Sequence, residues 1–377
     1  MIPVCDIFKT LLAIDNPSRQ ESELRNHVLG CFQSADTAGL ITQTQTDEIG
    51  NLFIRVDGTG QGSPMMFCAH MDSVPPCQGI QFVESIHENG EPIIQAAGTT
   101  ILGADDKSGI ATMIAIFQKL AAEGTKPPRT IEFLFTVQEE IGINGAKAFD
   151  LAQCESQHVF VLDGEGNLGD IFNAGPARRS IEIAVHGKQA HAMAPDAGVS
   201  AIYAALDVMQ HLPAFGRITP DSSFNLGRIR GGKARNVIAD DAFLEAELRS
   251  FSMTELEQFS KQVETACTTT QQKHPGSIIT SDIKHQYDPF VIPENAVSVQ
   301  AAAQACADIR ILSTQPLITR MYIGSDAHVL NARGREAIVL GMGFHGSHSV
   351  REFIQTRHLE GVFEWVWAMI HRCRQQA

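Results

Sequence analysis

A short apolar segment that ends abruptly in polar and charged residues constrains this chain more than any other feature. Residues 65–69 are apolar, His70 and Asp72 come directly after them, and glycine and proline lie on both sides. Short apolar runs bounded by glycine and proline are typical of buried strands. A histidine at the end of such a strand is either a structural residue or a metal ligand. An aspartate two residues later is a group that can orient a ligating histidine.

Acidic residues recur beside later apolar segments. A helical pattern that ends at Gly124 begins next to an aspartate pair, and strand-like runs at 130–137 and 158–162 each lead into acids. One such acid is explained by solvation or by the favourable potential at a helix N-terminus. Several of them predict a metal site, because ligands of an open α/β sheet bind beyond the carboxyl ends of its strands. The acids are Asp105, Glu139, Glu140 and Asp163.

The order of the expected elements predicts two domains. Residues 1–175 and 285–377 mix helical and strand patterns, as in an α/β domain. Residues 176–284 follow the order β-α-β-β-α-β of a small ferredoxin-like domain, inserted between the two parts of the first. The helices are expected at 3–14, 21–33, 110–124, 144–151, 201–212, 254–272, 293–306 and 356–373, and the strands at 41–46, 51–56, 65–70, 93–97, 130–137, 158–162, 180–185, 224–229, 242–251, 278–284 and 335–340.

Composition and charge exclude several classes of protein. The chain has 377 residues and a formal net charge of −14, which argues against nucleic acid or an anionic membrane surface as the main partner. The eight cysteines form no CxxC pair, the first residues lack a signal-peptide pattern, and no apolar run reaches the length of a membrane span. We therefore expect a cytoplasmic protein with reduced thiols and no membrane partner.

Five motifs in order resemble those of the co-catalytic zinc exopeptidases, the superfamily of peptidase T, aminoacylase and the glutamate-releasing carboxypeptidases. They are HMD at 70–72, GADDKSG at 103–109, QEE at 138–140, DG at 163–164 and HGSHS at 345–349.

The finer resemblance is to the peptidase T branch and its peptidase T-like relatives. It rests on GADDK, on the stretch YIGSDAHVLNARG at 322–334 and on the overall length. The resemblance implies a zinc-exopeptidase-like catalytic domain with an inserted α+β dimerisation or lid domain, and hence a homodimer.

The resemblance also implies a ligand set for two zinc ions in each subunit. His70 and Asp163 would hold one ion, Glu140 and His348 would hold the other, and Asp105 would bridge them. One histidine and carboxylate oxygens at each metal also suit cobalt or manganese. His348 is preferred to His345 as the ligand because the family places a serine and then an acid after it, here Ser349 and Glu352.

Catalytic roles follow from the same resemblance. Asp72 would hydrogen-bond the far nitrogen of His70 and fix its tautomer. Glu139 would act as general base, taking a proton from a metal-bridging water and delivering it to the leaving amine. His191 matches a histidine that completes the oxyanion site from the partner subunit, although a surface-loop histidine is the alternative.

Substrate contacts are the least determined part of the site. Asn236 matches a substrate-binding residue of the small domain. Arg249 either binds a substrate carboxylate or faces solvent from its strand, and the second is slightly favoured. Arg320 and Asp326 are further candidates.

The predicted function is that of a metal-dependent exopeptidase. It would hydrolyse the N-terminal amide bond of short peptides, as a tripeptide aminopeptidase does. The alternative keeps the chemistry on another substrate, as a dipeptidase, carboxypeptidase or N-acyl amino acid deacylase, because motifs around the metals do not fix specificity. A non-catalytic homologue would have lost a ligand or the base, and none is missing here. A serine hydrolase is disfavoured because the chain has no GxSxG motif.

Overall fold

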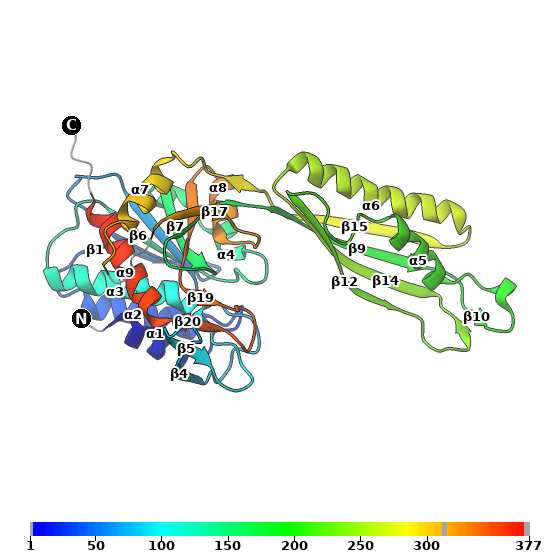
Figure 1. Cartoon of the computed structure of the whole chain (residues 1–377), viewed down its shortest axis with the longest axis horizontal. Coiled ribbons are helices and arrows are strands. Elements are labelled where there is room, and N and C mark those ends of the chain that lie inside the picture. Colours follow the sequence, from blue (N-terminus) through cyan, green and yellow to red (C-terminus); the bar gives the residue numbers. More distant parts are fainter. Residues whose placement is uncertain (1–2, 311–314, 373–377) are drawn as a thin grey trace. The chain divides into compact units, whose positions relative to one another are not determined.

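The computed structural model describes residues 3–310 and 315–372. It divides into two compact units, which are described separately (Figure 1). The large unit comprises Met1–Ala174, Val291–Met321 and Ser325–Ala377, and the small unit comprises Gly175–Phe290 and Tyr322–Gly324.

A nine-stranded mixed sheet forms the centre of the large unit. Its strands are β1 (Ile41–Thr46), β2 (Leu52–Val56), β3 (Met65–His70), β6 (Ile131–Thr136), β7 (His158–Gly164), β8 (Asp170–Gly175), β16 (Phe290–Val291), β17 (Leu317–Arg320) and β18 (Glu336–Gly341). The order is β1-β2-β6-β3-β7-β18-β8-β16, with β17 beside β8. The central strands β6, β3, β7 and β18 run parallel to one another. Every residue of β3 and β6 is buried, which explains why both strands are mostly apolar.

Helices of the large unit supply much of its hydrophobic core. They are α1 (Val4–Leu12), α2 (Ser22–Ala35), α3 (Ala104–Glu123), α4 (Asn144–Ala148), α7 (Val297–Cys306), α8 (Asp326–Ala332) and α9 (Thr356–His371). α3 packs on β3 and β7 and contacts α1, α2 and α9. The ring of Phe32 on α2 stacks on Phe117 of α3 at 4.6 Å and meets Phe133 of β6 edge-on at 5.3 Å. These contacts fix α3 against the sheet, and with it the loop at its N-terminus.

A second, four-stranded sheet completes the large unit. It contains β4 (Phe82–Ile86), β5 (Pro92–Ala96), β19 (Phe344–His345) and β20 (Phe353–Gln355), in the order β19-β20-β5-β4. This sheet joins the segment before α3 to the segment that carries His348, which are far apart in sequence. β4 was not predicted because it is short and its side chains are mostly exposed or half-buried.

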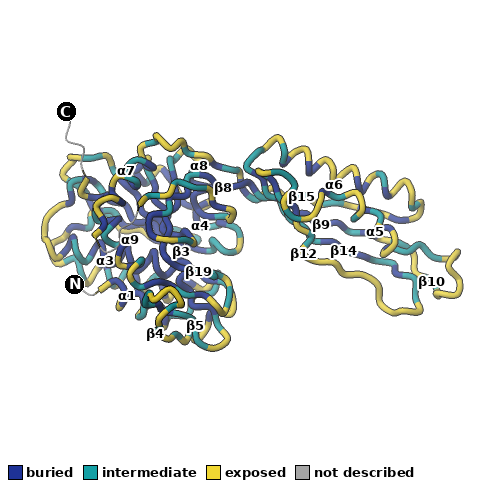
Figure 2. Tube along the Cα trace, in the orientation of Figure 1, coloured by how far each residue is buried: buried dark blue, intermediate teal, exposed yellow. Residues whose placement is uncertain are grey.

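The small unit is an antiparallel sheet with two helices. Its elements are β9 (Ala177–His186), α5 (Ala201–His211), β11 (Gly216–Arg217), β12 (Ser222–Gly231), β14 (Asp241–Ser250), α6 (Met253–Lys273) and β15 (Ile278–Tyr287), and the short pair β10 (Ala190–His191) and β13 (Val237–Ile238). The order β11-β12-β14-β9-β15 confirms the predicted ferredoxin-like arrangement. Both helices pack on the sheet, and Figure 2 shows buried residues along the strands that they cover.

Besides shifted boundaries, several elements were not predicted: β8, α8 and the short strands β10, β11, β13, β16, β17, β19 and β20. β8 was not predicted, because DIFNAG shows neither a clear alternation nor an unbroken apolar run. The last helix ends at His371, and residue 373 of the expected helix lies outside the described residues. Among the helices that the structure describes, none combines the length and the apolar character that crossing a membrane requires.

Candidate metal centre

Five predicted metal ligands meet at one edge of the large unit's sheet. Two groups of side chains there have ligand atoms that all lie within 4.8 Å of one another. The first group is His70, Asp105 and Asp163, and the second is Asp105, Glu140 and His348. His70 is the last residue of β3, Asp163 lies near the end of β7, and Glu140 follows β6. The parallel strands therefore bring these side chains to the edge where ligands of such sheets bind.

Asp105 belongs to both groups and offers a different oxygen to each. Its Oδ1 lies 2.8 Å from His70 Nε2, and its Oδ2 lies 3.3 Å from His348 Nε2. Asp163 Oδ1 is 3.5 Å from His70 Nε2, and Glu140 Oε1 is 3.0 Å from His348 Nε2. Each group thus offers one imidazole nitrogen and two carboxylate oxygens. This donor set fits zinc and leaves room for further ligands.

Burial and like charges perturb the acids of the first group. Burial, followed by the nearby charge of Asp105, raises the pKa of the Asp163 carboxyl to about 8. Burial also acts against the charge of Asp105, but hydrogen bonds to His348 and His70 bring its pKa well below the ordinary value. Burial opposes the charge on His70, yet hydrogen bonds to Asp105 and Asp163 raise its pKa well above the usual range. A bound cation would offset the repulsion among these buried acids.

Glu140 and His348 form a charge pair in the second group. Hydrogen bonds to Asp105 and Glu140 raise the pKa of His348 to about 11. Burial raises the pKa of Glu140, although its contact with His348 opposes that shift. The imidazole therefore holds a proton that a metal must displace.

Asp72 contacts both His70 and the segment that follows β6. Nδ1 of His70 lies 2.9 Å from the main-chain carbonyl oxygen of Asp72 and 3.5 Å from its carboxylate Oδ1. The carboxylate accepts hydrogen bonds from the backbone N–H groups of Glu139 at 2.8 Å and Glu140 at 3.2 Å, and from the Ser18 hydroxyl at 2.7 Å. The carbonyl rather than the carboxylate is thus the nearer partner of His70. The buried carboxylate orients the QEE segment.

Glu139 has the properties of a proton-transfer group. It is half-buried, and burial raises the pKa of its carboxyl well above the usual value. The charges of Asp163 and Glu140 act in the same direction, against that of His70. A carboxylate whose pKa is raised accepts a proton more readily, which suits a general base.

Asp106 fixes the loop-like N-terminal end of α3. The peptide bond between Asp105 and Asp106 is cis, and both residues have non-helical backbone angles. One Asp106 oxygen accepts from the N–H of His70 at 3.0 Å, and the other accepts from Gly109 N–H at 3.1 Å, as a helix N-cap does. A Cβ on Gly109 would lie 2.5 Å from the carbonyl oxygen of Leu162, so glycine is required where α3 approaches β7.

Glu352 is a further buried acid beside this loop. Its carboxylate accepts three backbone hydrogen bonds, from Leu102 and Gly103 at 2.8 Å and from Asp105 at 3.1 Å. Sequence reasoning used Glu352 only as a marker for His348. It did not find the hydroxyl of Ser18, for which no motif gave a signal.

His191 and Asn236 lie together in the small unit. β10 pairs with β13, and the N–H of Ala192 donates to the carbonyl oxygen of Asn236 at 3.0 Å. Both His191 and Asn236 are exposed. The predicted partner-facing histidine and the predicted substrate contact thus share one surface of this unit.

The remaining substrate candidates have different surroundings. Arg249 is half-buried and donates from Nε to Glu247 at 2.9 Å and from Nη1 to the carbonyl oxygen of Tyr322 at 3.0 Å. Both of its predicted roles stay predictions. Arg320 is exposed at the end of β17.

Asp326 needs a correction, because its side chain is not available to a substrate. The residue is only 1% exposed, and its Oδ2 accepts from Thr136 Oγ1 at 2.5 Å and from the Cys68 thiol at 3.5 Å. Thr136 and Cys68 belong to β6 and β3. Asp326 therefore supports the strands that present His70 and Glu139. Its position as the first residue of α8, within the sequence GSDA, gave no sign that its side chain is buried.

Comparison with known proteins decides the family. The profile of the family described as Peptidase family M20/M25/M40 matches residues 66–372, which is most of the chain. The chain belongs to peptidase family M20/M25/M40. With this fold and these two donor groups, this M20 peptidase is a metal-dependent hydrolase.

Relatives place this M20 peptidase near peptidase T. It is 32% identical to the uncharacterised YqjE protein of Bacillus subtilis over 96% of both chains. The aminopeptidase PepT of Bacillus cereus is 30% identical, with a TM-score of 0.85 over 98% of this chain and 97% of that one. A tripeptidase of Staphylococcus aureus is 26% identical, with a TM-score of 0.89 and the same coverage.

Proposed function

We propose that the chain is a two-zinc aminopeptidase that removes the N-terminal residue from short peptides. One observation carries the proposal: two donor groups share Asp105, while Asp72 holds the backbone of the adjacent Glu139. An aspartate that offers one oxygen to each of two groups suits a pair of metal ions.

The donor atoms assign the residues to the ions. His70 and Asp163 would hold one zinc ion, Glu140 and His348 would hold the other, and Asp105 would contact both. When bound, the two ions supply a lowered pKa for water and polarisation of the scissile carbonyl.

Glu139 carries the proton in this scheme. Its carboxylate takes a proton from the attacking water and delivers it to the amide nitrogen of the second residue, which leaves as the new N-terminal amine of the shortened peptide. Asp72 keeps the Glu139 backbone in place through the hydrogen bond to its N–H. The raised pKa of Glu139 favours the protonated form that must then act as an acid.

The substrate assignment draws on the relatives named an aminopeptidase and a tripeptidase. It is tested with tripeptides whose amino or carboxyl end is chemically blocked, using metal-replete protein and product masses. We expect the free tripeptide and the carboxyl-blocked tripeptide to be cleaved after the first residue, and the amino-blocked one to be left intact. Cleavage that survives the amino block would favour the carboxypeptidase or deacylase alternative.

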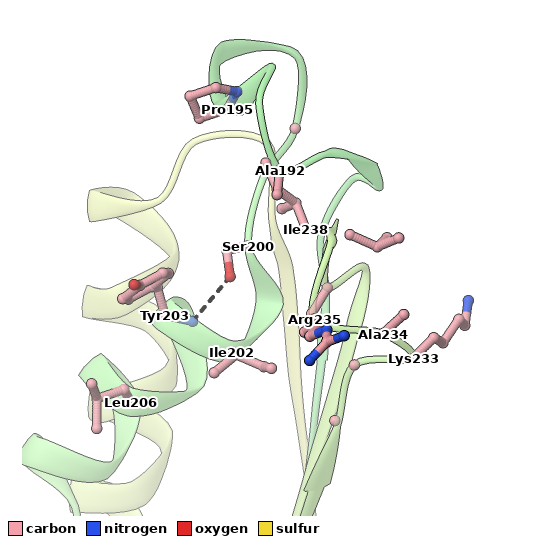
Figure 3. Close-up of a pocket in the computed structure, with 15 residues that line it drawn as sticks. Ala192, Pro195, Ser200, Ile202, Tyr203, Leu206, Lys233, Ala234, Arg235 and Ile238 are labelled. Carbon is pink, nitrogen blue, oxygen red and sulfur yellow. Dashed lines mark hydrogen bonds between the residues drawn. The ribbon is translucent and has the colours of Figure 1, made fainter.

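We also propose that the small unit forms a homodimer. A cavity of about 890 Å³ lies between α5 and the loop before β13 (Figure 3). Ile202, Tyr203 and Leu206 line it from α5 and are 47–70% exposed, which is unusual for apolar side chains gathered on one helix face. Lys233 and Arg235 come from the facing loop. Burial of this surface against a second copy would remove the apolar residues from water.

His191 would then act on the metal centre of the partner subunit. Mixing two inactive variants tests this, because His191→Ala keeps Glu139 and Glu139→Gln keeps His191. In a mixed dimer one site would regain both groups, so roughly a quarter of wild-type activity should return after random exchange of subunits. No recovery in dimers shown to be mixed would contradict action across subunits.

The proposed location is the cytoplasm. The seven cysteines that the structure describes are all free, and most are buried. Free thiols in this number suit a reducing compartment.

A further inference from the structure

His348 differs from the other predicted ligands in how its position is fixed. Its side chain is 51% exposed, whereas those of His70, Asp105, Asp163 and Glu140 are 2–10% exposed. The backbone φ of His348 is 60°, in the left-handed region that residues other than glycine rarely adopt. Packing therefore does little to hold this imidazole, and the loop around it must do so.

Residues 346–352, here called the His348 segment, are connected within themselves by short-range hydrogen bonds. The Ser349 hydroxyl donates to the carbonyl oxygen of Gly346 at 2.7 Å, and the N–H of Glu352 donates to the carbonyl oxygen of Ser349 at 3.1 Å. These bonds shape the turn, but they do not attach it to the sheet that carries the other ligands.

Glu165 attaches the first end of the segment. Its two carboxylate oxygens accept from the Gly346 N–H at 2.8 Å and from the Ser347 hydroxyl at 2.5 Å. Glu165 lies two residues after Asp163, a ligand of the first group. Backbone hydrogen bonds also join the chain after β7 to the chain after β18, such as the one from the Met342 N–H to the Gly164 carbonyl oxygen at 2.9 Å. They involve residues before the His348 segment. The Glu165 side chain extends this connection to the residue before His348.

Glu352 attaches the other end. It lies four residues after His348, is fully buried, and receives backbone N–H bonds from Gly103 and Asp105 at the N-terminal end of α3. The His348 segment is thus held at one end to the loop of Asp163 and at the other to the loop of Asp105.

We propose that Glu165 and Glu352 are positioning residues that order the His348 segment for metal binding and thereby set the metal affinity of the second group. The inference rests on the proposed two-metal function. Neither carboxylate touches a ligand side chain. Each removes conformational freedom from the loop before the metal arrives, so less ordering entropy is lost on binding.

Four variants separate this role from general effects of lost charge. Glu165→Ala removes both acceptors, whereas Glu165→Gln keeps an oxygen for the Gly346 N–H and an amide that can donate to the Ser347 hydroxyl. Glu352→Gln keeps the volume but turns an NH2 group toward backbone donors. Glu88→Ala removes an exposed acid on the turn after β4 and serves as the matched control.

The measurement is zinc affinity by competition with a chromophoric chelator, together with zinc content, on metal-free full-length protein. We expect Glu165→Ala to lower the affinity for the more weakly bound zinc ion by roughly tenfold and to leave the affinity for the other ion unchanged. Glu165→Gln should restore most of the lost affinity. Glu352→Gln should weaken binding of both ions, by roughly tenfold or more for the second, because its carboxylate also holds the loop of Asp105. Glu88→Ala should bind as the wild type does.

The outcomes distinguish this inference from the proposed function. If the wild type binds two zinc ions and Glu165→Ala binds both as tightly, the positioning role is overturned and the function stands. If Glu165→Gln binds the second zinc ion as weakly as Glu165→Ala does, the loss of affinity comes from lost charge rather than from lost hydrogen bonds. The positioning role is then again overturned. A wild type that binds no second zinc ion would overturn the proposed function itself.

Discussion

The two metal-ligand groups share Asp105 yet are built in different ways. The first is buried and draws His70 and Asp163 from the ends of neighbouring parallel strands. The second draws Glu140 from a turn and His348 from a half-exposed loop. The sheet itself thus fixes one group, while side-chain hydrogen bonds from other loops fix the second. We expect the first group to bind metal more tightly and the second to exchange it more readily.

The shared ligand gives the largest expected effect. Asp105→Ala removes an oxygen from both groups and should reduce kcat/KM by roughly 10³-fold or more, because several kcal/mol of charge stabilisation would be lost. Zinc content should fall below two ions per chain. Steady-state kinetics and metal analysis check both. A variant that keeps two ions and most of its activity would show that the groups are independent.

Removing one histidine from each group compares the two directly. In metal-free protein, His70→Ala leaves buried acids without their partner and should lower the free energy of unfolding by about 3 kcal/mol. His348→Ala breaks a half-exposed contact and should cost about 1 kcal/mol or less. Urea unfolding of both variants measures the difference. Equal losses of unfolding free energy in the two variants would contradict the view that burial fixes the first group more firmly than the second.

Asp163 gives the first group a pH dependence. Its pKa is about 8 in the folded protein, above the ordinary aspartate value, so the folded state holds a proton that the unfolded state has released. This contribution to stability is complete below the unfolded pKa and is lost as pH rises through about 8. The metal-free wild type should therefore lose a few kcal/mol between about pH 4 and pH 8.

The control for this pH dependence is Asp163→Asn, which cannot release a proton. Its free energy of unfolding should vary less over the same range, as measured by urea unfolding at several pH values. If the free energy of unfolding of the variant depends on pH as steeply as that of the wild type, a group other than Asp163 causes the pH dependence.

Ser18 gives the smallest effect, since it acts only through Asp72. Ser18→Ala removes one of three hydrogen bonds to the Asp72 carboxylate. We expect kcat to fall by roughly threefold to tenfold with zinc content unchanged, because a typical intramolecular hydrogen bond contributes about 0.5–1.5 kcal/mol. Kinetics and metal analysis on one preparation measure this. Loss of zinc instead would mean that Asp72 acts mainly on His70.

The sequence was most informative where the chemistry lies at the ends of strands. Apolar runs that end in His70 or Asp163 are visible without a structure, because a parallel strand that is buried on both faces is mostly apolar until it leaves the sheet. The ferredoxin-like insertion was visible for a similar reason, since alternating strands and amphipathic helices each have a regular period. The order of the expected elements followed from such patterns, whereas the family came from the resemblance of the five motifs.

Contacts between distant loops could not be predicted in the same way. Glu165, Ser18 and the buried Asp326 act through one or two side-chain hydrogen bonds to segments more than fifty residues away. No periodicity marks such a contact, because any exposed-looking acid or serine fits the local pattern equally well. The placement of Tyr322–Gly324 in the small unit likewise depends on tertiary contacts.

The most direct test of the central claim is the turnover of Glu139→Gln measured beside its zinc content. The substitution removes the proposed base but none of the five ligand side chains. We predict two zinc ions per chain, an almost unchanged KM for an unblocked tripeptide, and a kcat lower by roughly 10²–10⁴-fold. Turnover near the wild-type rate with both ions bound would contradict the account.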